Sequence, residues 1–295
     1  MPFLGAVRPL VLTRRKVQRK RAPRPYRGIH SRWLGWRDAR TLDGLIRQLF
    51  ATSAALTPQQ RFLARLWENK FLSLGNFGAT FPPRIFGPDD RFSAVRWFLG
   101  EMLAQHDAVV VAWKEKRRFD VLHPQTVVRL RYRGCAVSAF VGRAAGVRRI
   151  VAEEWESLVP TQPHSEYPSA SAVICSAAFE HARFLADEGI KARNLTALPP
   201  ITIAPNVSVL PSLAEEGFSS VTFDTFEEAA ESCGKSRLWA GVHFGPAVPA
   251  GLALGKGIGQ LAYEYVRDLK NGKVPDRCVL CRSSTRSAGL CFIKY

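Results

Sequence analysis

The sequence predicts an all-α protein, and three observations lead to that prediction. Two capping boxes mark helix starts, at Thr57 to Gln60 and at Thr225 to Glu228, because each pairs a threonine with an amide or acidic side chain three residues later. An apolar stripe at helical spacing follows Asp89-Asp90. The chain has 295 residues, of which 46% are hydrophobic and 23% charged, so it can bury a core in one large or two small domains.

Residues 1–39 form a basic segment. Eleven Lys and Arg residues precede the first acidic residue, Asp38, so the net charge of +17 leaves only about +6 for the rest of the chain. An apolar start at 3–12 precedes a basic octamer at 14–21, which reverses the order of a secretory signal. We expect this segment to be disordered, and three roles stay open: organelle targeting, nuclear import or RNA contact, and a plain solvated tail.

Helical patterns follow from Arg40 onward. The first capping box predicts a helix from Thr57 to about Leu74, before Gly75. The stripe after Asp89-Asp90 predicts the clearest helix of the chain. Its members are Val95, Phe98, Leu99, Met102, Leu103, Val109, Val110 and Trp113.

This stripe also carries polar residues. His106 lies on it, as a core histidine would, and three residues beyond Trp113 the same face reaches Lys116. A lysine at the end of a buried stripe needs a negative partner, unless its side chain extends past the helix end to water.

Further helices are predicted in the second half. Ser169 to Ser171 form the start of a helix over 172–188, where free N–H groups and the helix dipole favour an anion, although serines are also ordinary N-caps. Residues 190–224 are β-branched and proline-rich, which predicts an irregular excursion or a small hairpin. A last helix is expected over 250–270. Its glycines recur every four residues and let a neighbouring backbone approach closely: Gly251, Gly255 and Gly259.

The cysteine spacing and the hydropathy argue against a disulfide scaffold, a zinc site and an integral membrane protein. The six cysteines have no framework spacing, so we expect reduced thiols, and the single pair Cys278 and Cys281 is poor evidence for zinc. Residues 271–295 are expected to be an exposed tail. No apolar run approaches the ~18 residues that span a bilayer, so we expect a soluble protein.

Residues 236–244 place Arg237 and His243 six residues apart among apolar and small side chains. A guanidinium fits tetrahedral oxyanions, and a neutral imidazole can bind a metal-like centre or attack phosphorus. The nonamer therefore indicates an oxyanion site. The alternative is a salt-bridged arginine beside a core histidine bonded to backbone.

Three blocks of the chain resemble the signature of vanadium-dependent haloperoxidases and of the type 2 phosphatidic-acid phosphatase (PAP2) superfamily. That signature contains Lys followed after six residues by Arg-Pro, then Pro-Ser-Gly-His, then Ser-Arg followed after five residues by His. The corresponding blocks here are Lys116 with Pro124, Pro168-Ser169-Ala170-Ser171, and Ser236-Arg237 with His243. The surroundings, such as Glu166-Tyr167, are closer to soluble haloperoxidases than to lipid phosphatases.

The resemblance implies a role for each matching residue. Lys116 and Arg237 would neutralise the equatorial oxygens of vanadate or phosphate, and Ser169 would donate its hydroxyl. Ala170 would lie beside the anion, at the family's glycine. His243 would be the axial ligand to vanadium, or the phosphoryl-accepting nucleophile of a phosphatase.

Four positions depart from the family pattern. His123 replaces an arginine and so loses a permanent charge, and Ala170 replaces glycine. Ser171 replaces the acid–base histidine and cannot shuttle a proton near neutral pH. Ala247 stands where a further acidic residue is expected. The anion pocket is expected to survive while catalysis through His123 and Ser171 weakens.

The resemblance implies a helical bundle of the haloperoxidase and PAP2 type over residues 40–270. The chain is long enough for only one such bundle, so it remains open whether it is a truncated gene product. The implied function is oxidation of halide by hydrogen peroxide at a bound vanadate, with phosphate as a competing anion. Hydrolysis of a small phosphate ester through His243 is the alternative, and a degenerate, non-catalytic oxyanion-binding relative is the third interpretation. We expect a soluble intracellular protein, with targeting or nucleic-acid contact by the basic arm left open.

Overall fold

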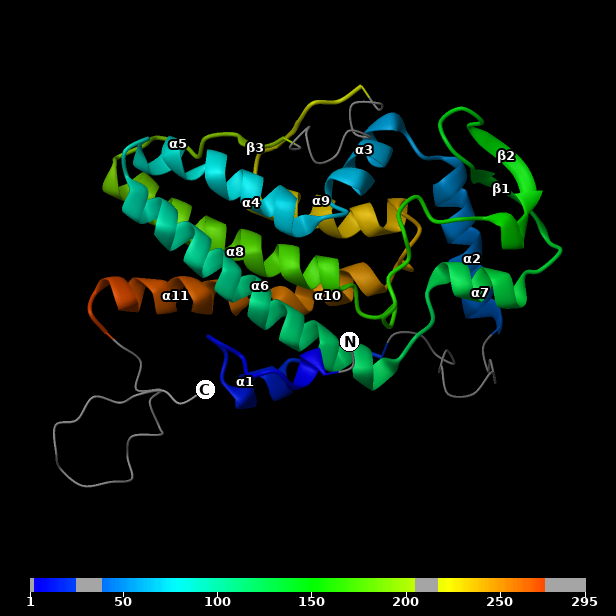
Figure 1. Ribbon diagram of the computed structural model, residues 1–295, viewed down its shortest axis with the longest axis horizontal. Coiled ribbons are helices and arrows are strands. Elements are labelled where there is room, and N and C mark those ends of the chain that lie inside the picture. The colour runs from blue at the N-terminus through cyan, green and yellow to red at the C-terminus, as the bar shows by residue number, and fades with distance from the viewer. Residues whose placement is uncertain (1–2, 25–38, 205–216, 274–295) are drawn as a thin grey trace.

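The computed structural model describes residues 3–24, 39–204 and 217–273. The fold is all-α as predicted, with short strands at its periphery (Figure 1). The helices are η1 (Leu4–Ala6), α1 (Arg14–Arg19), α2 (Ala39–Ala54), α3 (Pro58–Leu66), α4 (Lys70–Thr80), α5 (Pro82–Phe86), α6 (Arg91–Phe119), α7 (Pro124–Arg131), η2 (Ala152–Glu154), α8 (Ala170–Ala192), α9 (Phe226–Trp239), α10 (Ala247–Gly255) and α11 (Ile258–Lys270). No helix in the described ranges is long and apolar enough to cross a membrane.

Helix α8 lies at the centre of the bundle and packs against α6, α9, α10 and α11 (Figure 1). Small side chains such as Ala172 and Ala177 are fully buried along it, so its neighbours can approach closely. A Cβ on Gly251 of α10 would collide with the Ser169 carbonyl, and one on Gly255 with the Val173 carbonyl. The predicted close approach at these glycines is therefore confirmed.

Helix α6 confirms the predicted helix but corrects its orientation. Asp90 caps it by accepting a hydrogen bond from Ser93 N at 2.9 Å. The first half of the predicted apolar stripe faces outward, and Val95 is 61% exposed. The face that packs on the bundle combines Trp97 with small apolar and with polar residues: Gly100, Glu101, Ala104, Gln105, Ala108, Val111 and Ala112. Periodicity detects an apolar face but cannot tell which neighbour that face meets.

Two predicted helices are interrupted. The capping box at Thr57 is present in full, but α3 ends at Leu66, and Asn69 caps a new helix, α4. The helix expected over 250–270 is broken between α10 and α11, where Gly257 has a φ of +79°. A left-handed residue cannot continue an α-helix, so the chain changes direction there.

The strands form two antiparallel hairpins in the described part of the chain. Strands β1 (Ala136–Phe140) and β2 (Val147–Val151) pair in a hairpin that the sequence analysis did not predict. Strands β3 (Ile201–Ile203) and β4 (Val221–Phe223) pair within the predicted excursion, which is a hairpin.

The prediction of disorder for the basic N-terminal segment is wrong for residues 3–24. The Asp107 carboxylate of α6 accepts backbone hydrogen bonds from Leu10, Val11 and Leu12 at 2.6–2.9 Å. The Glu115 carboxylate accepts another from Ala22 N at 2.9 Å. Two buried carboxylates of α6 thus hold a segment whose composition alone indicates a solvated tail.

The prediction of reduced thiols is also corrected. Cys175 of α8 and Cys233 of α9 form a disulfide, with their Cα atoms 6.3 Å apart. The close packing of these two helices brings together cysteines 58 positions apart in sequence. Cys135 is an exposed free thiol. The cysteines of the predicted tail, 278, 281 and 291, lie outside the described residues.

Candidate functional site

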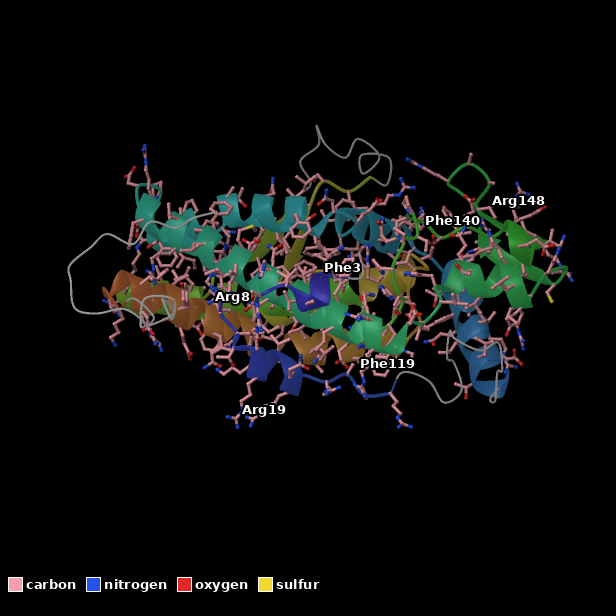
Figure 2. All side chains as sticks on the ribbon, turned by 60° about the horizontal axis from the view of Figure 1, so that its bottom comes forward. Phe3, Arg8, Arg19, Phe119, Phe140 and Arg148 are labelled. Atoms are coloured by element: carbon pink, nitrogen blue, oxygen red, sulfur yellow. A yellow bond between two sulfur atoms is a disulfide. The ribbon has the colours of Figure 1, made fainter. Side chains whose placement is uncertain are left out.

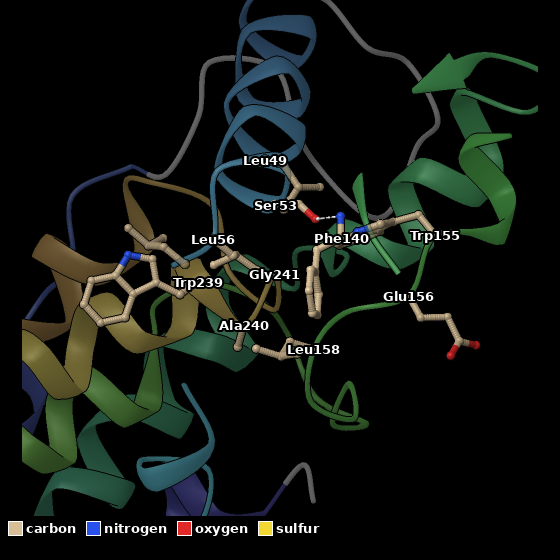
Figure 3. Close-up of a pocket in the computed structure, with 11 residues that line it drawn as sticks. Leu49, Ser53, Leu56, Phe140, Trp155, Glu156, Leu158, Trp239, Ala240 and Gly241 are labelled. Carbon is tan, nitrogen blue, oxygen red and sulfur yellow. Dashed lines mark hydrogen bonds between the residues drawn. The ribbon is translucent and has the colours of Figure 1, made fainter. Parts of the chain in front are cut away.

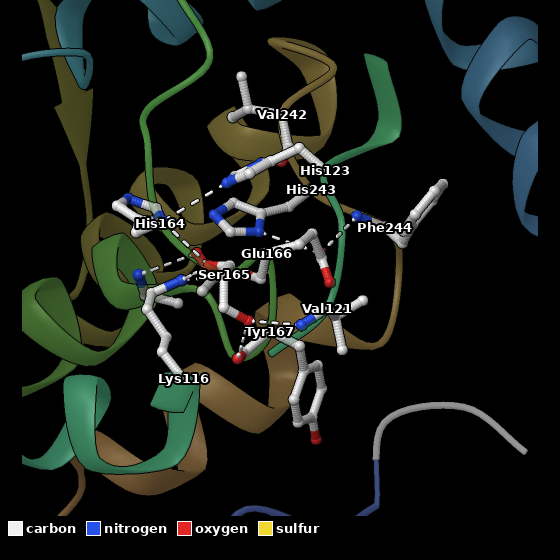
Figure 4. Close-up of polar contacts among 12 residues, drawn as sticks. Lys116, Val121, His123, His164, Ser165, Glu166, Tyr167, Val242, His243 and Phe244 are labelled. Carbon is white, nitrogen blue, oxygen red and sulfur yellow. Dashed lines mark hydrogen bonds and ion pairs between the residues drawn. The ribbon is translucent and has the colours of Figure 1, made fainter. Parts of the chain in front are cut away.

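Four segments meet around His243 (Figure 4). They are the end of α6 with Lys116, the start of α7 with His123, the residues before α8 with His164 and Glu166, and the turn after α9. Lys116, His123, Glu166 and His243 are all buried. The structure thus brings residues from distant parts of the sequence into one polar cluster inside the bundle.

The turn after α9 positions His243. Gly241 has a φ of +75°, and two hydrogen bonds close the turn, from Gly241 N to Leu238 O at 3.0 Å and from Val242 N to Arg237 O at 3.2 Å. These are the two bonds of a Schellman motif, which ends a helix and redirects the chain. Trp155 packs so closely on Gly241 that a Cβ there would lie 2.8 Å from its ring.

Figure 3 shows the apolar pocket beside this turn, to which Trp155 and Gly241 contribute. Its volume is about 20 Å³, the size of one water molecule, and its lining is mostly apolar, with Leu49, Leu56 and Phe140 facing the turn. This small cavity supports the turn and is too small to hold a substrate.

Glu166 orients the imidazole of His243. Its Oε1 lies 3.0 Å from His243 Nδ1 and accepts a second hydrogen bond from Phe244 N at 2.9 Å. A carboxylate only accepts, so Nδ1 carries the proton and Nε2 keeps its lone pair. A partner of this kind commonly fixes the tautomer of a ligating histidine.

His243 is neutral despite this carboxylate. Burial lowers its pKa well below the usual value, and the charges of Lys116, His123, His164 and Arg237 lower it further. The histidine therefore lies among several cationic or basic groups and one acid. Buried Arg237 is cationic at neutral pH and Lys116 is partly so, and buried cations of this kind fit an anion.

Lys116 points into the protein, which is one of the two orientations that the sequence left open. Its Nζ donates to the carbonyl oxygens of Ser165 at 2.5 Å and of Glu166 at 3.2 Å. Burial lowers its pKa to about 7, and the Glu166 charge opposes that shift. The ammonium thus has neutral acceptors as its hydrogen-bond partners and can exchange them for a charged ligand.

Arg237 is buried at the end of α9. It donates from Nη2 to Ala64 O at 2.5 Å and from Nε to Ser236 Oγ at 3.0 Å. Burial lowers its pKa to about 10, and the charge of Glu68 opposes this shift.

Burial also lowers the pKa of Lys70 to about 7, and the nearby Arg237 charge lowers it further. Lys70 is a cation near the site that the sequence analysis missed.

Ser169, Ala170 and Ser171 begin α8. Ser169 is the N-cap, and its Oγ accepts a hydrogen bond from Ala172 N at 3.4 Å. All three residues are buried. Ser169 N donates to Ala247 O at 3.1 Å, so this helix start is tied to the start of α10. The acid expected at Ala247 is absent, and Glu166 supplies a carboxylate from another segment.

His123 and His164 form a pair beside His243. His123 Nδ1 donates to Val242 O at 2.9 Å, and its Nε2 lies 3.4 Å from His164 Nδ1. The rings of His123 and His243 are 5.7 Å apart. Burial lowers the pKa of His123 to about 4 and that of His164 to about 3, and Lys116 lowers both further. His123 therefore supplies no charge at neutral pH.

A cavity of about 340 Å³ opens next to this pair. Lys116 and His164 line it together with Trp113, Arg117, Asp120, Pro163 and Ser165. His164 therefore stands between the solvent-filled cavity and the buried His123.

The donor set suits an oxyanion better than a metal cation. In the described ranges, no group of three or more His, Cys, Asp or Glu side chains is arranged to hold a metal ion. Lys116, Arg237 and Ser169 offer donors, and His243 Nε2 offers a lone pair. Donor groups of these types suit a tetrahedral oxyanion such as vanadate or phosphate. Glu166, Lys70 and His164 were not assigned to the site from the sequence, because the motif spacing does not include them.

Comparisons with known proteins agree with the helical-bundle fold. The family model of the VCPO second helical-bundle domain matches residues 96–272. The apo-type bacterial vanadium-dependent chloroperoxidase has a TM-score of 0.74 and 27% identity, with 90% of this chain and 56% of that one covered. The holo-type structure of a bacterial vanadium-dependent chloroperoxidase has a TM-score of 0.75 and 26% identity, with 92% of this chain and 55% of that one covered.

A more distant structure shares the fold alone. The first bacterial vanadium-dependent iodoperoxidase has a TM-score of 0.61 and 18% identity, with 89% of this chain and 56% of that one covered. The chain thus spans little more than half the length of the structures it matches. No curated protein sequence matches it.

Proposed function

Because this chain belongs to the family of the VCPO second helical-bundle domain, we propose that it binds vanadate and oxidises halide with hydrogen peroxide. The proposed site consists of Lys116, Ser169, Arg237 and His243, and His243 would hold the vanadium through its Nε2. The observation that carries the proposal is the buried, neutral His243, which Glu166 holds and which lies within the electrostatic influence of Lys116 and Arg237.

Each residue contributes a separate part of the site. Lys116 and Arg237 would balance the anionic charge, and the Ser169 hydroxyl would donate a hydrogen bond. Glu166 keeps the proton on His243 Nδ1, which leaves Nε2 free to bind. Vanadate, when bound, supplies Lewis-acid activation of the peroxide toward the halide.

The proton that the chemistry requires needs a carrier. Ser171 cannot serve near neutral pH. His164 lines the 340 Å³ cavity and contacts His123, so it lies on a route from solvent to the cluster. We assign the proton role to His164. Because its pKa of about 3 makes it a weak base near neutral pH, we expect turnover to be slower than a histidine of ordinary pKa at position 171 would give.

Phosphate monoester hydrolysis through His243 is the second candidate. The same cations and the same unprotonated Nε2 suit a phosphoryl group, with His243 as the nucleophile. A non-catalytic oxyanion-binding relative is the third, and the departures at His123, Ala170 and Ser171 favour it.

Thermal melts with orthovanadate test the site itself. A ligand at 100 times its dissociation constant raises the free energy of unfolding by ~2.7 kcal/mol. We expect this stabilisation in the native protein and in His106→Ala, because His106 lies on α6 beside Asp107 and outside the cluster. We expect none in His243→Ala. An unchanged melt of the native protein at millimolar vanadate would contradict the proposal.

Activity assays separate the candidates. Vanadate-loaded protein is supplied with hydrogen peroxide and bromide, and bromination of a phenolic dye is followed by absorbance. The phosphatase candidate is assayed without vanadate on a chromogenic phosphate monoester. Stabilisation by vanadate without either activity would identify the non-catalytic relative.

A further inference from the structure

The disulfide between α8 and α9 lies one helical turn from the proposed anion site on both helices. On α8, Cys175 is four residues after Ser171. On α9, Cys233 is four residues before Arg237. Residues four apart lie on the same face of a helix, so each cysteine stands directly behind a residue at the site. Side chains fill the space between the helices (Figure 2), and both cysteines are fully buried there.

Short contacts lead from Cys233 to Arg237. The Ser236 hydroxyl donates to the carbonyl oxygen of Cys233 at 2.6 Å and accepts from Arg237 Nε at 3.0 Å. Ser236 is fully buried, so water does not compete for these bonds. On the other side, Cys233 Sγ lies 3.9 Å from Ser171 O in the first turn of α8. A shift of Cys233 relative to α8 is therefore passed on to the guanidinium.

Small residues make the remaining contact between the two helices at this end. A Cβ on Gly234 would lie 3.6 Å from the Ala172 Cβ, and neither residue has a side chain long enough to interlock with the partner helix. In the described ranges, the other polar link between α8 and α9 is the ion pair of Arg183 and Glu227 at 3.3 Å, far from the site and partly exposed. Exposed ion pairs contribute little. The disulfide is thus what fixes the register of the helices beside the site.

The proposed anion site needs one register of these helices. Ser169 caps α8 and Arg237 lies near the end of α9, and both would donate to the same anion. Packed helices that lack a crosslink shift by about 1–2 Å in many proteins. A shift of that size takes a donor out of hydrogen-bond distance, because such bonds weaken beyond about 3.2 Å.

We propose that the disulfide of Cys175 and Cys233 positions Arg237 against Ser169, so that the disulfide form of the protein binds an oxyanion more tightly than the dithiol form. The inference rests on the proposed oxyanion site and adds regulation by redox state to it. A dithiol reductant supplies the two electrons: its two thiols become a disulfide, and the two cysteines become thiols. Cys175 and Cys233 act through Arg237, so they are positioning residues.

Binding of inorganic phosphate to the full chain, measured by isothermal titration calorimetry, tests the proposal. Phosphate is the probe because thiols do not reduce it. The protein reduced with dithiothreitol, and the double variant Cys175→Ala with Cys233→Ala, should bind phosphate roughly 5- to 150-fold more weakly than the oxidised native protein, the usual range of coupling between two sites. Dithiothreitol should leave the affinity of the double variant unchanged, because its crosslink is already absent.

Two controls separate positioning from stability, with every protein shown by circular dichroism to be folded. Leu185→Ala removes buried packing from α8 ten residues beyond Cys175, at a comparable loss of stability and with the disulfide intact. It should bind phosphate like the native protein. Cys135→Ala removes the exposed free thiol and should keep the full response to dithiothreitol. A loss of affinity in Leu185→Ala equal to that of the double variant would overturn the proposal.

Reciprocity between the two sites gives a second measurement. Saturating phosphate must lower the equilibrium constant for reduction of the disulfide by the same factor as reduction lowers the phosphate affinity. Mixtures of reduced and oxidised dithiothreitol, followed by alkylation and mass spectrometry of Cys175 and Cys233, measure that constant. Equal phosphate affinities of the oxidised native protein and the double variant would overturn this inference alone. No phosphate binding by the oxidised protein would overturn the anion site and this inference with it.

Discussion

Glu166 Oε1 lies 3.0 Å from Nδ1 of His243, and both side chains are buried although they are 77 positions apart in sequence. This pair links the segment before α8 to the turn after α9. It determines which nitrogen of His243 is free. The chemistry proposed for the site depends on this contact.

Glu166→Gln should weaken vanadate binding by about 10- to 100-fold, the usual cost of losing the partner of a ligating histidine. Glutamine can still accept from Phe244 N, so the fold should persist. Equilibrium binding of vanadate measures the effect. Glu156→Gln, at a carboxylate whose side chain is 76% exposed, is the control and should bind like the native protein. Equal affinity in both variants would show that Glu166 has only a structural role.

Lys116 should make stability depend on pH. Its pKa is about 7 in the fold against an ordinary value of 10.5, so between these pH values the unfolded chain holds a proton that the folded chain lacks. The free energy of unfolding should therefore rise with pH across this window. Lys116→Met should flatten the rise of the free energy of unfolding with pH. Lys235 is an exposed lysine paired with Glu231, so Lys235→Met should leave that rise unchanged. Urea unfolding at several pH values measures the slope.

The same titration should govern anion binding. The Lys116 ammonium is protonated below pH 7, so vanadate affinity should be highest there and fall above it, by up to about tenfold per pH unit. Equilibrium binding from pH 6 to pH 9 tests this. A flat profile would exclude Lys116 as an anion contact.

The departures from the family pattern make a prediction about rate. The double change Ser171→His with His123→Arg should raise peroxide-dependent halide oxidation, because acid–base help is worth ~10²–10⁴ in rate and arginine restores a permanent charge. In the otherwise native protein, His164→Ala should lower the rate of halide oxidation more than Ser171→Ala does. Brisk native turnover that neither single change affects would mean that another group carries the proton.

The disulfide should contribute to stability. Cys175 and Cys233 are 58 positions apart, and closing a loop of that length stabilises a fold by about 4 kcal/mol in the chain-entropy model. The double change of both cysteines to alanine should lower the midpoint of denaturant unfolding. Cys135→Ala removes an exposed free thiol and should leave the midpoint unchanged. If Cys135→Ala lowered the midpoint as much as the double change did, the disulfide would not be the source of the stability.

The sequence by itself determined the helix starts and the spacing of the site residues. Thr57, Asp90, Ser169 and Thr225 each cap a helix where the residues predict one, because a cap depends on side chains within one turn. The spacing along α6 also placed Lys116 at the end of an apolar stripe, but it left open whether the side chain points inward or extends to water. These are local properties of the chain.

Only the tertiary structure decided which residues meet. The first half of the apolar stripe of α6 faces outward, the Asp107 carboxylate holds a segment almost 100 positions earlier, and Glu166 reaches His243 from another loop. Periodicity and capping report a residue's neighbours within a turn or two. The partner of a buried charge is chosen by the packing of whole helices, because that packing decides which distant groups leave water together.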